Sequence, residues 1–194
     1  MSADLAMMTA ADQAARYRDR SLSPVEVAKV TFARIREANP SVNAFVFTTE
    51  EEALAQAKAS EARWKKGTPL IGFDGVTATI KDLVLMKGHP TLKGSLTVAH
   101  NGDWSEDSPC TARLREAGAV LVGKTTTPEF GWAGVTHSLQ HGVTRKFKPL
   151  DHVHRLGRRF AVQRANRAAM AMAADNDFTH LQIEHGKLDC RGRS

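Results

Sequence analysis

Apolar side chains alternate with polar ones between Gly75 and Lys81, and this alternation predicts a β-strand. Val76, Ala78 and Ile80 would face the core, so the strand would turn Lys81 to its other face. Chemistry in open α/β sheets collects outside the strand ends, and a lysine at such an end is therefore a candidate catalytic residue. The alternative is a solvated lysine or one paired with an aspartate, because lysines are mostly exposed.

The strongest helix signal begins at Ser23. This serine suits the N-cap, Pro24 suits the first helical position, and the Glu26 carboxylate can return to the cap. A core-facing stripe then follows at spacings of three, four and three (Val25, Ala28, Phe32, Ile35). We expect Asn39-Pro40 to end this helix, because proline disrupts a helix interior.

Two further helices and a second strand are expected downstream. Residues 49–52 resemble a capping box that opens a helix ending at Gly67, and Ser108-Pro109 opens a helix that Gly118 stops. Residues 119–122 are apolar and are predicted to form a buried strand. The order strand, helix, strand predicts an α/β sheet with mostly parallel pairing.

Residues 118–125 read Gly-Ala-Val-Leu-Val-Gly-Lys-Thr and satisfy the phosphate-loop expression G-x-x-x-x-G-K-[ST]. That motif requires a strand before its first glycine, a flexible loop and a helix after the lysine. Here a helix pattern precedes Gly118, the middle residues favour a strand, and Pro128 interrupts any early helix. We therefore interpret the segment as a strand with Gly123 at its exit, and we expect no nucleotide to bind there.

His137 and His141 have the spacing of two metal ligands on a helix. Nearby glycines indicate irregular backbone instead, and no clear carboxylate or third ligand accompanies the pair, so we expect no metal and no organic cofactor. Ser108, Ser138 and the threonines near Lys124 carry hydroxyl groups that could act as nucleophiles. None of them has a base at a diagnostic spacing.

The length of 194 residues fits one domain, and 42% hydrophobic with 25% charged residues is typical of a soluble globular protein. No apolar run approaches the roughly 18 residues that a membrane helix needs, and the N-terminus lacks a signal-peptide pattern. The two cysteines, Cys110 and Cys190, give no disulfide framework. We therefore expect a cytoplasmic protein without a membrane partner.

Several blocks of the sequence resemble the amidase signature family: residues 69–82, 88–95, 112–131 and 142–145, with the resemblance spanning roughly residues 10–152. The resemblance implies a layered α/β fold with a mixed sheet flanked by helices, of which this chain holds the N-terminal part. It also implies hydrolysis of the carbon–nitrogen bond of a small amide by a Ser, cis-Ser, Lys triad. In that pattern Lys81 matches the triad lysine, and no cofactor is involved.

The resemblance stops near residue 152. In the family, a segment like 142–145 leads into a Gly-Ser-rich run that supplies the cis-serine, and a second Gly-Ser segment supplies the nucleophile. Neither run occurs here, and the next serine after Asp151 is Ser194. We therefore expect residues 1–152 to form a partial amidase-signature domain that is truncated and inactive as this chain, because a lysine without a nucleophile does not attack an amide.

Residues 153–194 are expected to form a divergent basic tail. Residues 151–194 hold eight Lys or Arg and five Asp or Glu, so half of the net charge of +6 lies there. One hypothesis is an extension that binds nucleic acid or a protein partner. A solvated or disordered tail is the simpler interpretation, so nucleic acid is not the expected partner. A third hypothesis is a frameshift near residue 152.

Two other functions stay open. A related amidotransferase protein would use the same triad to release ammonia from glutamine for a tRNA-linked substrate. A non-catalytic interaction protein with a basic tail would show no hydrolysis and would bind a stable partner. A sheet that is cut short would also expose an edge strand, which favours self-association.

The frameshift hypothesis makes a prediction about the coding DNA. We expect the codons for residues 151–194 and the bases beyond, translated in the other forward frames, to show a Gly-Ser-rich segment and a second serine motif. An independent DNA read checks this. If no frame contains either motif, the chain is a genuine short relative, and its function lies in binding rather than in hydrolysis.

Overall fold

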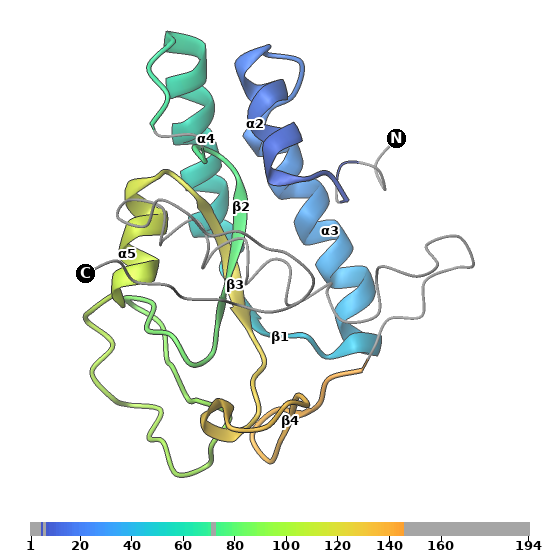
Figure 1. The fold of residues 1–194 in the computed structure, drawn as a ribbon, viewed down its shortest axis with the longest axis vertical. Coiled ribbons are helices and arrows are strands. Elements are labelled where there is room, and N and C mark those ends of the chain that lie inside the picture. The colour runs from blue at the N-terminus through green and yellow to red at the C-terminus, as the bar shows by residue number, and fades with distance from the viewer. Residues whose placement is uncertain (1–4, 6, 71–72, 146–194) are drawn as a thin grey trace, which may run out of the picture.

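The computed structural model describes residue 5 and residues 7–70 and 73–145; the tail expected at 153–194 lies outside the described residues. Figure 1 shows a small sheet beside its helices, with the long segment before α5 looping away from the strands. The elements are α2 (Ala10–Arg18), α3 (Pro24–Val42), β1 (Phe45–Thr48), α4 (Glu50–Lys66), β2 (Thr77–Lys81), α5 (Pro109–Glu116), β3 (Val120–Thr125), the 3-10 turn η1 (Glu129–Gly131), β4 (His137–Ser138) and β5 (Gly142–Val143).

The main sheet has the strand order β1-β3-β2, so β3 is its central strand. β2 and β3 are parallel and are connected through α5, whereas β1 runs antiparallel to β3. The expected α/β fold with a mixed sheet flanked by helices is confirmed. The prediction of mostly parallel pairing is correct for β2 and β3 only. A separate antiparallel pair, β4 with β5, follows the main sheet.

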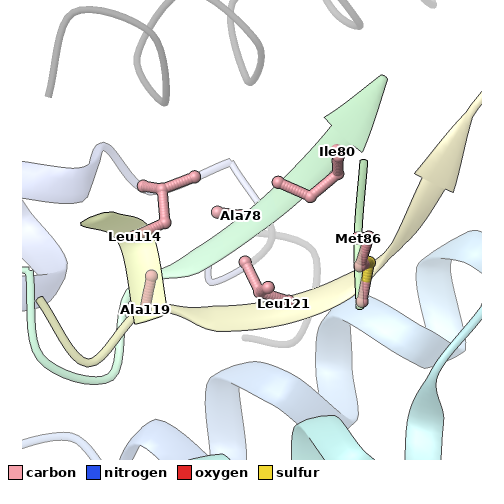
Figure 2. Close-up of a cluster of buried hydrophobic side chains, with 6 residues drawn as sticks. All are labelled: Ala78, Ile80, Met86, Leu114, Ala119 and Leu121. Atoms are coloured by element: carbon pink, nitrogen blue, oxygen red, sulfur yellow. The ribbon is translucent and has the colours of Figure 1, made fainter. Parts of the chain in front are cut away.

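β3 is buried along its whole length because apolar side chains cover both of its faces. On one face, Val120 and Val122 pack with apolar residues of α3 and α4. On the other face, Leu121 packs with Leu114 of α5 and with Ile80 of β2 (Figure 2). Since side chains alternate along a strand, this one element joins two hydrophobic clusters.

A β-bulge in β3 changes the face that its last residues use. Ala78 pairs with Leu121, but Ile80 pairs with Lys124, so three residues of β3 advance while β2 advances by two. Lys124 therefore lies on the same face as Leu121, whereas uninterrupted alternation would place it on the opposite face. Gly123 lies at this irregularity with a φ of +142°, and a Cβ atom there would meet the backbone of β1.

The sequence predicts the start of α3 correctly but not its end. The capping box is confirmed, since the Ser23 side chain accepts from the first turn and Glu26 reaches back to the Ser23 N–H. Pro40 does not end the helix, which continues to Val42 and is closed by Asn43 in the left-handed conformation. A proline so close to the last turn interrupts few helical hydrogen bonds, so the helix tolerates it.

Pairing with β3 overrides two local signals. Thr49 precedes α4 as expected, but its hydroxyl donates to the carbonyl of Leu121 at 2.8 Å and makes no cap hydrogen bond. Gly123 lies within β3, not at its exit. The interpretation of residues 118–125 as a strand after a helix is confirmed, because α5 precedes the segment and β3 occupies most of it.

Apolar side chains stand exposed in the segment that follows β3. They are Phe130, Trp132, Val135, Leu139 and Val143, and Trp132 is 86% exposed. None of the helices in the described ranges has both the length and the apolar character that crossing a membrane requires. The segment from Phe130 to Val143 thus presents several large apolar side chains that are half or mostly exposed.

Replacing Gly123 by alanine is expected to lower the free energy of unfolding by about 3 kcal/mol. The new Cβ atom would lie 2.3 Å from the carbonyl oxygen of Phe47 and 2.8 Å from the Cα of Thr48, so β1 would have to move away from β3. Denaturation with urea measures the change.

Gly67→Ala is the matched control for this prediction. Gly67 has a φ of +74°, but nothing lies within 4 Å of an added Cβ atom, so only the conformational cost of about 1–2 kcal/mol is expected. Equal losses in the two variants would contradict the steric explanation for Gly123.

Candidate active site at the end of β2

Lys81 is the last residue of β2 and lies at the carboxyl end of the strand, as the sequence predicts. It pairs in register with Thr125 of the neighbouring strand, so the two side chains share one face of the sheet. Lys81 is half-buried, and its ammonium group forms no ion pair with any residue that the structure describes. Burial lowers the pKa of Lys81, because desolvation disfavours the charged form.

Asp82, the next residue, forms its ion pairs with two residues that are distant in sequence. Its carboxylate lies 3.0 Å from Nζ of Lys124 and 3.1 Å from Nε2 of His141. The backbone N–H of Leu92 donates to the same carboxylate at 3.3 Å. Because Asp82 is fully buried, these partners replace its water. Among the described residues, Asp82 thus pairs with Lys124. The alternative interpretation of Lys81, in which it pairs with an aspartate, is not seen in that part of the chain.

Lys124 is fully buried, and each proton of its ammonium group has an acceptor. Besides Asp82, the group donates to the carbonyl of Pro90 at 3.0 Å and to Oγ1 of Thr91 at 2.5 Å. An ammonium has three donors, so its hydrogen-bonding capacity is filled. A phosphate-loop lysine has to reach a bound phosphate, whereas the ammonium group of Lys124 is buried and bonded to Asp82, Pro90 and Thr91.

The partners of the Asp82 carboxylate favour its ionised form. Burial alone would raise the pKa of Asp82, but the hydrogen bond from His141 and the charge of Lys124 bring it below its ordinary value. Burial also lowers the pKa of Lys124, and the Asp82 carboxylate opposes that change. With the carboxylate ionised and the ammonium fully bonded, two opposite charges cancel beside the end of β2.

Thr125 brings a buried hydroxyl to the face of Lys81. Its Oγ1 atom has no hydrogen-bond partner within the described part of the chain. An unsatisfied buried hydroxyl costs about 1–3 kcal/mol, so such groups normally have partners. The end of the β2–β3 pair therefore offers an amine and a hydroxyl that the described residues leave without partners.

The serines considered as nucleophiles bond to local groups instead. Ser108 is the N-cap of α5, and Oγ of Ser138 accepts the backbone N–H of His141 at 3.1 Å. Neither hydroxyl contacts a carboxylate or an imidazole ring among the described residues. The hydroxyl of the buried Ser95 donates to the Glu129 carboxylate at 2.6 Å. No local sequence pattern predicted this contact.

The two histidines do not share a helix. His137 belongs to β4, and His141 lies in the turn before β5, where its ring contacts Asp82. Within residues 5, 7–70 and 73–145, no group of three or more His, Cys, Asp or Glu residues could hold a metal ion. The carboxylate partner of His141 could not be found from local spacing, because the two residues are 59 positions apart.

Sequence comparisons relate this arrangement to known proteins. The amidase family model matches residues 26–155. The chain is 38% identical to the indoleacetamide hydrolase of Bradyrhizobium diazoefficiens over 138 residues, which cover 70% of this chain and 26% of the relative. It is 37% identical to a glutamyl-tRNA(Gln) amidotransferase subunit of Pseudomonas fluorescens over 146 residues, which cover 75% of this chain and 30% of the relative.

Solved structures show the same relationship. A bacterial aryl acylamidase of the amidase signature family matches with a TM-score of 0.69 and 27% identity, over 73% of this chain and 30% of that chain. The peptide amidase of Stenotrophomonas maltophilia matches with a TM-score of 0.64 and 27% identity, over 72% and 30%. The chain thus spans less than a third of the length of these proteins. Since the family model covers more than half of its residues, the chain belongs to the amidase signature family.

Proposed function

We propose that this chain contributes the lysine of a site that hydrolyses the carbon–nitrogen bond of a small amide. The observation that carries the proposal is the state of Lys81: it ends β2, it is half-buried, and it has no carboxylate partner among the described residues. A general base must be able to lose its proton near neutral pH, and burial without an opposing charge favours that form of lysine.

In the proposed mechanism, neutral Lys81 accepts a proton from a bridging serine, which takes one from the nucleophilic serine as that residue attacks the amide carbonyl. The proton returns to the leaving amine when the carbon–nitrogen bond breaks. The unpartnered hydroxyl of Thr125 lies on the same face of the sheet and supports a polar site there. Backbone donors would stabilise the oxyanion.

The two Gly-Ser segments that would supply the serines are absent from residues 1–194. We therefore propose that these residues alone do not hydrolyse amides and that Lys81 acts only together with serines from additional sequence. The names of two relatives, indoleacetamide hydrolase and acylamidase, support a small amide as the substrate class. The amidotransferase relatives support glutamine as the alternative substrate.

Several expectations stay predictions: the divergent tail at 153–194, a cytoplasmic location, and self-association. The exposed apolar side chains between Phe130 and Val143 support self-association, because association could remove them from water. The alternative of a non-catalytic interaction protein would rest on the same surface.

The purified 194-residue chain is expected to release no ammonia above background from indoleacetamide or glutamine, because an amine without a nucleophilic serine gives little acceleration. A coupled ammonia assay measures this, with the indoleacetamide hydrolase of Bradyrhizobium diazoefficiens as the positive control. Turnover that disappears in Lys81→Met would contradict the proposed inactivity and would support the role of Lys81.

Replacing Lys81 by methionine is expected to stabilise the fold at pH 7 by about 1 kcal/mol, which raises Tm by about 2–4 °C; the gain is small because solvent screens a half-buried ammonium. Folding lowers the pKa of Lys81, so the unfolded chain binds more protons between the folded pKa and about 10.4. The destabilising contribution is fully present below the folded pKa and disappears as pH rises through the unfolded value. The gain should therefore shrink towards pH 10.

Lys81→Arg is the matched control, since arginine keeps its charge throughout this pH range. It should be less stable than the parent chain, and the difference should grow with pH as Lys81 loses its proton and arginine does not. Thermal unfolding followed by circular dichroism between pH 7 and pH 10 measures both variants. A stability loss in Lys81→Met that is the same at every pH would contradict a desolvated ammonium.

A further inference from the structure

We propose that Thr125 is a positioning residue, whose hydroxyl group forms a hydrogen bond with the Lys81 amine and fixes the direction of that amine in the site. The inference rests on the proposed function of Lys81 as a general base, because a base needs a defined direction towards the proton that it accepts. It assigns a role to a buried hydroxyl group that the proposed proton transfers do not use.

The first observation is the face of the sheet on which the two side chains lie. Lys81 and Thr125 are paired in register on neighbouring parallel strands, whose backbones run roughly 5 Å apart. Thr77, on the same face of β2 as Lys81, pairs with Val120, which packs with apolar residues of α3 and α4. Both side chains therefore lie on the face that α3 and α4 cover, whereas Lys124 lies on the opposite face with Leu121.

The second observation is the surroundings of the Thr125 hydroxyl group. In the sheet, Thr125 lies between Phe45 of β1 and Lys81 of β2, which are its two partners in register. The Phe45 side chain packs against the apolar cluster of α3 and α4 and carries no hydrogen-bonding group. Thr125 is 1% exposed, and its Oγ1 atom has no partner among the described residues. Of its two neighbours across the sheet, only Lys81 can supply one.

The third observation is that no described contact holds the Lys81 amine in another direction. The amine forms no ion pair within the described part of the chain, and a lysine side chain has several staggered rotamers. It can therefore turn towards Thr125 without losing an ion pair. A buried hydroxyl group without a partner destabilises a fold, so the hydrogen bond removes an unfavourable state.

The charged groups of the neighbouring elements have other partners or are exposed. The Asp82 carboxylate is bonded to Lys124 and His141, and β1 carries no charged residue. The charged residues of α3 and α4 are exposed or are bonded to groups other than Lys81. Burial is accordingly the cause of the lowered pKa of Lys81, and a further change in that pKa reports on the immediate surroundings of the amine.

The test is the titration of Lys81 in the complete 194-residue chain, followed by NMR of lysine labelled at Cε and assigned with Lys81→Arg. Thr125→Val keeps the shape of the side chain and removes its hydroxyl group. A hydroxyl acceptor stabilises an ammonium group more than a neutral amine, so the Lys81 midpoint should fall by about 0.5–1 pH unit in this variant. Thr125→Ser keeps the hydroxyl group and should titrate within about 0.3 pH unit of the parent chain.

The sign of the change separates this proposal from a purely structural role. If Thr125 only packs within the sheet, Thr125→Val leaves the Lys81 midpoint unchanged. If the replacement loosens the site, water reaches Lys81 and the midpoint rises towards that of a solvated lysine. Either result would overturn the proposal. Should Thr125→Val fail to fold, Thr125→Ala is measured in its place, and the same fall is expected.

The NMR order parameter of the Lys81 Cε group is the second measurement, because it reports how tightly the end of the side chain is held. It should be lower in Thr125→Val than in the parent chain and should recover in Thr125→Ser. Equal order parameters in the three proteins would contradict a positioning role.

Thr77→Val is the matched control, because Thr77 lies on the same face of β2 but roughly 13 Å from Lys81 along the strand. It should leave the Lys81 midpoint unchanged. The proposed function fails separately: a parent chain in which Lys81 titrates like a solvated lysine contradicts its role as a base. The positioning role of Thr125 is then judged only on the differences between the parent chain, Thr125→Val and Thr125→Ser.

Discussion

The buried ion pair between Lys124 and Asp82 is the interaction on which the described structure depends most. Neither charge has access to water, so each must be bonded inside the protein, and the required partners come from separate segments. Lys124 lies on β3, Thr91 lies in the loop after β2, and His141 lies in the β4–β5 turn. Because both buried charged groups require bonding partners, their contacts constrain the relative positions of these segments at the end of β2.

The same requirement explains the irregular register of the sheet. Up to Val122, the side chains of β3 alternate regularly between the two hydrophobic clusters. The bulge at Gly123 then shifts this alternation by one residue. Without the bulge, Lys124 would point towards α3 and α4, where the neighbouring side chains are apolar. A glycine is needed there because the backbone of β1 leaves no room for a side chain. Gly123 thus affects both the register of the sheet and the position of the Lys124 charge.

Local signals predicted the elements well and the site in part. The capping box at Ser23 and the alternation that ends at Lys81 depend on neighbouring residues only, so the sequence was sufficient for both. The cap at Thr49 and the helix end at Pro40 were wrong because tertiary contacts and position within the last turn decided them. The contact of His141 with Asp82 was beyond prediction, since it joins residues that are far apart in the chain and carry no shared motif.

The central position of β3 also has a consequence for the order of folding. β1 and β2 precede β3 by many residues, yet each pairs with β3 and not with the other. Helices α3 and α4 can form early from local contacts, but their apolar faces stay open until Val120 and Val122 arrive. During synthesis, the apolar faces of α3 and α4 would thus stay exposed to water until β3 has been made. A nascent chain stalled before residue 120 would therefore be prone to aggregation or to chaperone binding.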